Sequence, residues 1–116
     1  MKLLDNVRKE DLVKFGFSSS NDSVFRMQKN LFKNLIAMRI EVDLDERTID
    51  YEVFDRNNQS LYAPFYYNLN GENNLVAIKV ADAFRAIVKK LEQSKIIKME
   101  DKNNDDEKDN RNGAKN

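Results

Sequence analysis

The sequence predicts an α+β fold: an antiparallel meander of three to four strands covered by a long C-terminal helix, with a short N-terminal helix. Apolar and polar residues alternate in two runs between Leu35 and Asp55, which is typical of half-buried antiparallel strands. From Leu75 to about Ser94, apolar residues instead recur at helical spacing, which indicates an amphipathic helix. A helix about 30 Å long can cover strands of about 27 Å, and a meander without a cover is only marginally stable.

The N-terminal helix is predicted over residues 8–15. Leu12 and Phe15 lie three residues apart and therefore share one face of it. Gly16 follows as a residue that adopts the left-handed conformation at a helix C-terminus, and Phe17 can fold back onto the helix. The polar run over residues 18–22 predicts a loop.

The first strand is predicted over residues 24–31, with Phe25 and Met27 inward. In the next two strands the inward residues are Ile36, Met38, Ile40, Val42, Ile49, Tyr51 and Val53. The outward positions carry Arg39, Glu41, Asp43, Asp50, Glu52 and Asp55. Residues 56–59 form a turn whose Asn residues tolerate positive φ. A fourth strand near residues 61–67 contains Pro64, which has no backbone N–H, so we expect an edge strand or a bulge there.

The C-terminal helix begins after Asn73 or Asn74, either of which can cap it. A strand over Leu75–Val80 is the alternative for its first part. Ile96, Ile97 and Met99 form a short apolar ending that packs back on the domain or meets a partner. From residue 101 to residue 116 the only aliphatic side chain is Ala114, so nothing offsets the entropy of ordering. We therefore expect one domain over residues 1–100 and a disordered polar tail over residues 101–116.

Composition excludes several classes of function. The chain has no cysteine, hence no disulfide, thiolate metal site or cysteine nucleophile, and no histidine, the commonest general base and metal ligand. The formal net charge is +0, so no overall field favours nucleic acid or an anionic membrane. The sequence shows no signal-peptide apolar region and no membrane-length apolar run. We expect a cytoplasmic protein that is not an enzyme and holds no cofactor or metal.

The predicted outer strand face has the strongest local charge. Seven acids and one arginine lie between Glu41 and Asp55. Asp43, Asp45 and Glu46 surround one turn, where carboxylates can converge on a divalent cation, although the spacing lacks the glycine and the terminal glutamate of a calcium loop. A solvated face that discourages sheet association is the favoured interpretation. A protein-binding patch comes second, and a metal site last.

Aromatic residues give a second candidate surface. Phe54, Tyr62 and Tyr66 face outward in the predicted strands and form a candidate protein-binding spot. A cover by the N-terminal helix, with Phe15 and Phe17, is the slightly favoured alternative. The candidate partner-binding residues are therefore Glu41, Asp43, Asp50, Glu52, Phe54, Tyr62 and Tyr66.

The C-terminal helix gives the alternative, a nucleic-acid surface. Its candidate residues are Lys79, Arg85, Lys89 and Lys90, which can contact phosphates. The same charges also complement the negative end of the helix dipole. No aromatic residues interleave with them to stack on bases, so the structural explanation is favoured.

The run Asp11-Leu12-Val13-Lys14-Phe15-Gly16-Phe17 and the frequent Asn and Lys residues resemble small uncharacterised proteins of phages and mobile elements in AT-rich Gram-positive bacteria. The resemblance names no family. It implies an accessory role. Our functional hypothesis is a small protein-binding or assembly module that binds another protein or a second copy of itself as a homodimer. A nucleic-acid-binding accessory protein is the alternative.

Overall fold

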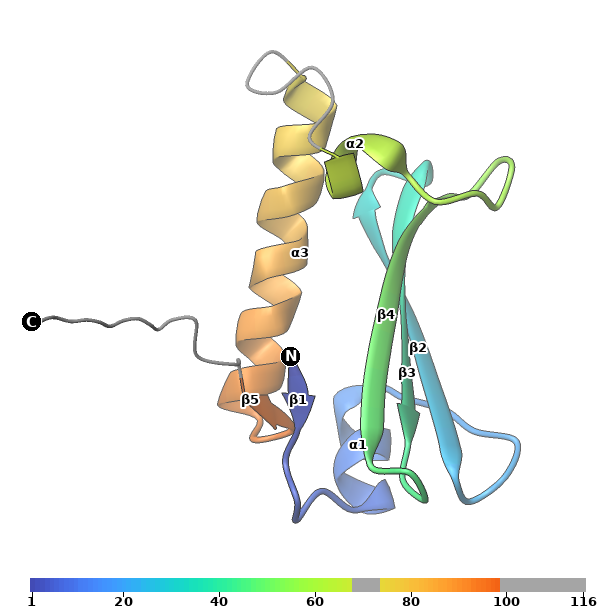
Figure 1. Cartoon of the computed structure of the whole chain (residues 1–116), viewed down its shortest axis with the longest axis vertical. Helices are drawn as coiled ribbons and strands as arrows, with labels where there is room; N and C mark the ends of the chain where they lie inside the picture. Colours follow the sequence, from blue (N-terminus) through green and yellow to red (C-terminus); the bar gives the residue numbers. More distant parts are fainter. Residues whose placement is uncertain (68–73, 99–116) are drawn as a thin grey trace, which may run out of the picture.

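The computed structural model describes residues 1–67 and 74–98; the predicted tail and Met99 lie outside the described residues. An antiparallel sheet with the strand order β2-β3-β4 forms one layer, and the long helix α3 forms most of the other (Figure 1). This architecture confirms the predicted fold class. In chain order the elements are β1 (Lys2–Leu3), α1 (Lys9–Phe15), β2 (Val24–Phe32), β3 (Ile36–Asp43), β4 (Thr48–Asp55), α2 (Ala63–Tyr67), α3 (Leu75–Gln93) and β5 (Ile97–Lys98).

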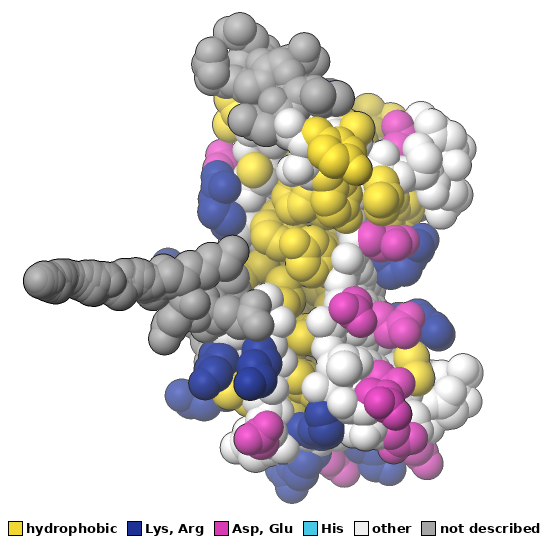
Figure 2. All heavy atoms as spheres, in the orientation of Figure 1, with side chains coloured by type: hydrophobic (Ala, Val, Ile, Leu, Met, Phe, Trp, Pro, Cys, Tyr) yellow, Lys and Arg dark blue, Asp and Glu magenta, His cyan; other side chains and the backbone are white. Residues whose placement is uncertain are grey.

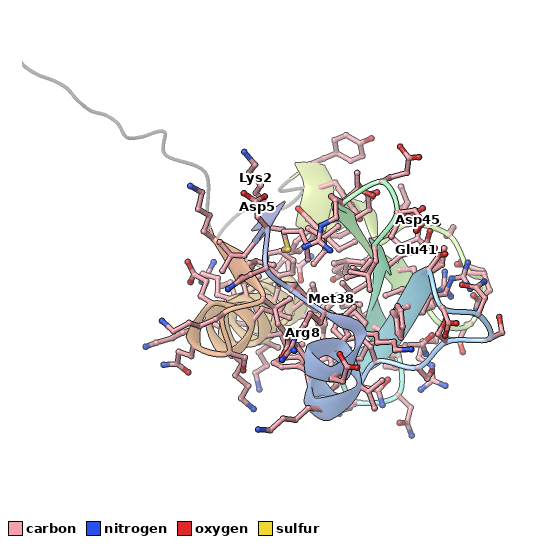
Figure 3. All side chains as sticks on the ribbon, turned by 90° about the horizontal axis from the view of Figure 1, so that it is seen from below. Lys2, Asp5, Arg8, Met38, Glu41 and Asp45 are labelled. Carbon is pink, nitrogen blue, oxygen red and sulfur yellow. The ribbon has the colours of Figure 1, made fainter. Side chains whose placement is uncertain are left out.

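The register of the sheet separates an apolar inner face from a charged outer face, as the alternation predicts. Across the inner face, one row of paired residues is Met27, Ile40 and Tyr51. Across the outer face, the adjacent row is Arg26, Glu41 and Asp50. Seen along the strands, Met38 lies on the side of the sheet that faces α3, and Glu41 lies on the opposite side (Figure 3). Because the side-chain period is two, this register places every inner residue of β3 in the core.

Helix α3 covers the inner face but is not centred on it. Asn74 caps the helix, accepting a hydrogen bond of 2.9 Å from the Ala77 N–H, and the segment Leu75–Val80 is helical rather than extended. Val80, Val88 and Leu91 are buried in the same core as Met38. Among the three strands of the sheet, α3 runs closest to β2. No helix of the described part of the chain has the length and apolar character of a membrane span.

Helix α1 ends as its sequence predicts. The Gly16 N–H bonds to the Val13 carbonyl at 3.1 Å and the Phe17 N–H to the Leu12 carbonyl at 2.9 Å, with Gly16 at φ 130°. These two hydrogen bonds form the Schellman motif, which satisfies backbone carbonyls that have no partner within the helix. Phe17 folds back and is buried with Leu12.

The predicted fourth strand near residues 61–67 is wrong. Leu61 makes an isolated bridge with Phe54, and the chain then forms the short helix α2. Pro64 is the second residue of α2, where its missing N–H removes no intrahelical hydrogen bond. The sheet therefore has three strands, the lower of the two numbers expected.

Smaller differences have equally local reasons. Asp55, expected outward, lies opposite Ile36 and on the same side of β4 as Val53, two residues away. Its carboxylate accepts the Asn57 N–H at 2.8 Å. In the turn that follows, the positive φ falls on Gln59, at 63°, rather than on an Asn.

The apolar segment after α3 packs back on the domain, which is one of the two alternatives that the sequence allowed. Ile96 and Ile97 are buried, and β5 pairs with β1, so the two ends of the described chain meet. Arg47, in the turn between β3 and β4, fixes the segment after β1. Its guanidinium donates to the carbonyls of Val7, Leu4 and Asp5 at 3.0, 2.9 and 2.7 Å.

Gly16→Ala should lower the free energy of unfolding by about 1–2 kcal/mol, because a Cβ is strained at positive φ. Space is not the reason, since the nearest atom to such a Cβ, Met27 Sδ, is 3.5 Å away. Urea denaturation measures the loss. Val13→Ala, at an exposed position of the same helix, is the control and should change stability by at most about 0.5 kcal/mol. Equal stability of Gly16→Ala and wild type would contradict the role given to Gly16.

Arg47→Ala should loosen the N-terminal segment, because three carbonyls lose a charged donor. We expect the Leu4 N–H, which bonds to the Ile96 carbonyl at 3.0 Å, to exchange with deuterium roughly tenfold faster. Arg47→Lys should recover only part of the protection, since an ammonium group lacks the planar fork of guanidinium. Unchanged exchange at Leu4 in Arg47→Ala would refute this anchoring role.

Candidate functional site

The inner face of β4 is covered at both ends and open between them. Ile49 and Val53 are 8% and 0% exposed, but Tyr51, which lies between them on the same face, is 38% exposed. The Tyr51 ring packs against Phe84 of α3, with ring centroids 5.0 Å apart. Because α3 runs closest to β2, this aromatic contact connects the helix with β4 on the far side of the sheet.

An apolar groove begins beside this opening. It is a hollow of about 440 Å³ between α2 and α3, lined by Pro64, Phe65, Ala77, Ile78, Ala81, Phe84 and Arg85. The ring centroids of Phe65 and Phe84, which both line it, are 4.9 Å apart. Ile78 is 39% exposed at its margin. Figure 2 shows hydrophobic atoms continuing down the side of the molecule between α3 and β4, which is a larger apolar surface than scattered single residues produce.

A second hollow, here called the acidic hollow, lies along β3 and β4 and is lined mainly by residues of the outer face. It has a volume of about 290 Å³ and is lined by Arg39, Glu41, Asp50, Tyr51 and Glu52. Tyr51 thus belongs to the lining of one hollow and packs on the lining of the other. In Figure 2, acidic side chains border the hydrophobic surface on the side of β4.

Ion pairs across the strands neutralise much of the acidic outer face. Arg39 bonds to Glu52 at 2.6 Å, and Arg26 bonds to Glu41 at 3.0 Å. The sequence between residues 41 and 55 shows neither pair, because Arg39 lies just before this range and Arg26 comes from β2. No ion pair among the described residues involves Asp50. Exposed pairs of this kind contribute at most about 1 kcal/mol each, so their main effect is on the surface charge.

Of the two alternatives for Phe54, the covered one is correct, because its side chain is 1% exposed. Phe54 does face outward, but the Arg39 guanidinium lies over its ring at 4.2 Å and Leu61 bridges to its backbone. The element expected to cover it is wrong, since Phe15 and Phe17 of the N-terminal region pack into the inner core. Phe54 is therefore a buried support for the outer face.

Asp43 closes the turn after β3. Its carboxylate accepts the N–H groups of Asp45 and Glu46 at 3.0 and 3.1 Å, and Asp45 itself accepts from the Ser23 hydroxyl at 2.8 Å. These bonds explain the acids of the turn as local capping groups. Residues 1–67 and 74–98 contain no group of three or more side chains arranged to hold a metal ion.

Two of the predicted site tyrosines stand on α2 and just before it. The Tyr66 hydroxyl accepts a hydrogen bond of 2.8 Å from the Val53 N–H at the free edge of β4. Burial raises the pKa of Tyr66, Tyr51 and Glu52 add to the rise, and the bond from Val53 opposes it. Burial likewise raises the pKa of Tyr62, with a bond to Asn74 opposing and the charge of Asp55 adding.

The basic residues of α3 do not form one continuous face. At about 100° per residue, Lys79 and Lys90 lie on one side of the helix and Arg85 lies roughly 120° from Lys79. Arg85 is paired with Asp82 and lines the apolar groove. Only Lys89 lies between the two directions, so the structure spreads the four candidate cations over a wide arc.

Ile78, Ala81 and Phe84 are not recognisable in the sequence as groove residues, because their spacing indicates a helix that packs on a sheet. Phe65, expected in a fourth strand, lies on α2 instead. One signal was available. Ala77, Ile78 and Ala81 broaden the apolar stripe of α3 beyond the side that Val80 and Leu91 bury. An apolar stripe wider than one sheet contact needs a second cover or remains exposed.

Comparison with known proteins supports the fold alone. No family model matches the chain, and no curated protein matches it. A solved structure, a DUF1831 family protein (lp2179) from Lactobacillus plantarum, matches with a TM-score of 0.64 over 81% of each chain and 15% sequence identity. The shared architecture agrees with the α+β layers described above, and at this identity nothing about binding or activity follows from it.

Tyr66→Phe should lower the free energy of unfolding by about 1 kcal/mol, because the Val53 N–H loses its acceptor. Tyr67→Phe is the control, since Tyr67 is 72% exposed.

The raised pKa of Tyr66 also predicts that stability depends on pH. The unfolded tyrosine deprotonates first, near pH 10, so its contribution is present below that pH and is lost above it. Urea denaturation from about pH 9 to about pH 11 should show a smaller loss in Tyr66→Phe than in wild type, and an equal loss would contradict the assignment.

Proposed function

We propose that this chain is a small, non-enzymatic protein-binding module that takes an apolar segment of its partner in the groove between α2 and α3. The observation that carries the proposal is the apolar surface around Tyr51, Phe84 and Ile78, which the described residues leave exposed. Exposed apolar surface of this extent commonly marks an interaction site. Aromatic residues at its centre are the type enriched among residues that dominate binding energy.

The composition of the groove supports docking over chemistry. Six of its seven lining residues are apolar, and the seventh, Arg85, is paired with Asp82. Acid–base catalysis needs a titratable group held within reach of a bound substrate. The groove lining supplies an apolar surface and a charged margin, which is the composition of a contact surface for another protein.

The nucleic-acid alternative has weaker support. Its four candidate cations on α3 are spread around the helix axis, and Arg85 already has an acidic partner. A phosphate backbone is bound more effectively by cations that lie along one line or patch. The phage or mobile-element role and the cytoplasmic location stay predictions from the sequence.

Ile78→Glu should abolish partner capture, because a carboxylate in the groove opposes burial of an apolar side chain. Ala86→Glu adds the same charge at an exposed position of α3 outside the groove and should leave capture unchanged. The measurement is affinity capture from a lysate of the source organism with quantitative mass spectrometry. Thermal unfolding should show both variants folded. Partners retained by Ile78→Glu at the wild-type level would refute the proposal.

Light scattering on wild type, Ile78→Glu and Ala86→Glu tests whether the groove is instead occupied by a second copy of the chain. The proposal expects a monomer in all of them. A homodimer in wild type and Ala86→Glu that is lost in Ile78→Glu would show that the groove binds another copy of this chain.

A further inference from the structure

We propose that the segment bound in the groove is basic as well as apolar, and that a Lys or Arg side chain of the partner binds at Asp50 in the acidic hollow. This inference rests on the proposed function and names the chemistry of the partner. It joins two hollows that are linked through one residue, since Tyr51 lines the acidic hollow and packs on Phe84 of the groove.

Tyr51 sets the geometry. Its ring packs on Phe84, which lines the apolar groove, and Tyr51 is also one of the residues that line the acidic hollow. Asp50, the next residue of the strand, points to the other face of β4. A partner segment that fills the groove therefore reaches Asp50 by crossing the free edge of β4 beside Tyr51.

The charges of the acidic hollow are unbalanced at one place. Glu52 is neutralised by Arg39, and Glu41 is held by Arg26. Asp50 lies directly opposite Glu41 in the register, and among the described residues neither β3 nor β4 gives Asp50 a cation. Like charges placed opposite each other across two strands are destabilising. A cation from a partner relieves this repulsion, so the site is complementary to Lys or Arg.

A second copy of the chain is a poor occupant of this surface. A two-fold axis near Tyr51 brings the two copies of Asp50 toward each other, which adds repulsion to a site that already has an excess of acid. A partner rich in acid is disfavoured for the same reason. A segment with apolar and basic residues satisfies both hollows at once.

The test is selection of a displayed random peptide library against the full chain. We expect enriched peptides to combine aliphatic or aromatic residues with an excess of Lys and Arg, and to be absent when the library is selected against Ile78→Glu. Selection against Asp50→Lys should replace the basic excess by an acidic one. For a synthetic copy of the best peptide, Asp50→Asn should weaken binding roughly threefold. Glu46→Gln removes the same charge from the β3–β4 turn and should have no such effect.

The outcomes separate the two proposals. Apolar peptides without a basic excess, or a basic excess unchanged by Asp50→Lys, overturn the basic partner while the protein-binding function stands. Peptide selection that is equal on wild type and Ile78→Glu overturns both. Binding of the best peptide that strengthens at high salt also overturns the inference, since a charge-assisted contact at an exposed site weakens with screening.

Discussion

The architecture depends on a difference in width between the helix α3 and the three-stranded sheet that it covers. A helix with its side chains is about 10–12 Å across, whereas three strands at about 4.8 Å spacing present a face of about 14 Å. Helix α3 lies nearest to β2, so the cover of β4 comes from other elements at its two ends. The N-terminal segment, anchored by Arg47, lies near one end, and the segment leading into α2 bonds to Val53 at the other. Tyr51 lies between these covers, and the groove is a consequence of that gap.

The outer face of the sheet buries two apolar residues by means of a single long side chain. Within residues 1–67 and 74–98 no helix covers it, yet Ala37 and Phe54 are buried there. Arg39 makes this burial possible, because its side chain lies over the Phe54 ring while its guanidinium bonds to Glu52. A long cationic side chain can shield apolar surface and keep its charge in solvent. The same residue therefore closes a small apolar cluster and removes one of the acids from the local charge excess.

The sequence pattern predicts those helices and strands that are long enough to show a clear periodicity. Strands β2 to β4 and helix α3 follow directly from alternation and helical spacing, and Gly16 predicts the end of α1. The apolar run before residue 67 reads as a strand in the sequence but is the helix α2, because five residues are too few to distinguish a helical period from a strand period. Pro64 is also compatible with a first helical turn. The two-residue strands β1 and β5 have no pattern at all. The exposure of Tyr51 depends on where α3 lies across the sheet, a long-range property that alternation cannot report.

The identity of residue 50 is informative in its own right. If the outer positions of β4 served only to prevent the edge strand from associating with other sheets, a lysine would serve as well as an aspartate. A lysine opposite Glu41 would also replace a repulsive cross-strand pair by an attractive one. The aspartate is therefore the less stable choice for the isolated fold, and it stands beside the one inner-face residue of β4 that the fold leaves half uncovered. Local sequence choices that oppose stability are expected at sites that serve binding, so the carboxylate of Asp50 and the open ring of Tyr51 are best understood as parts of one surface.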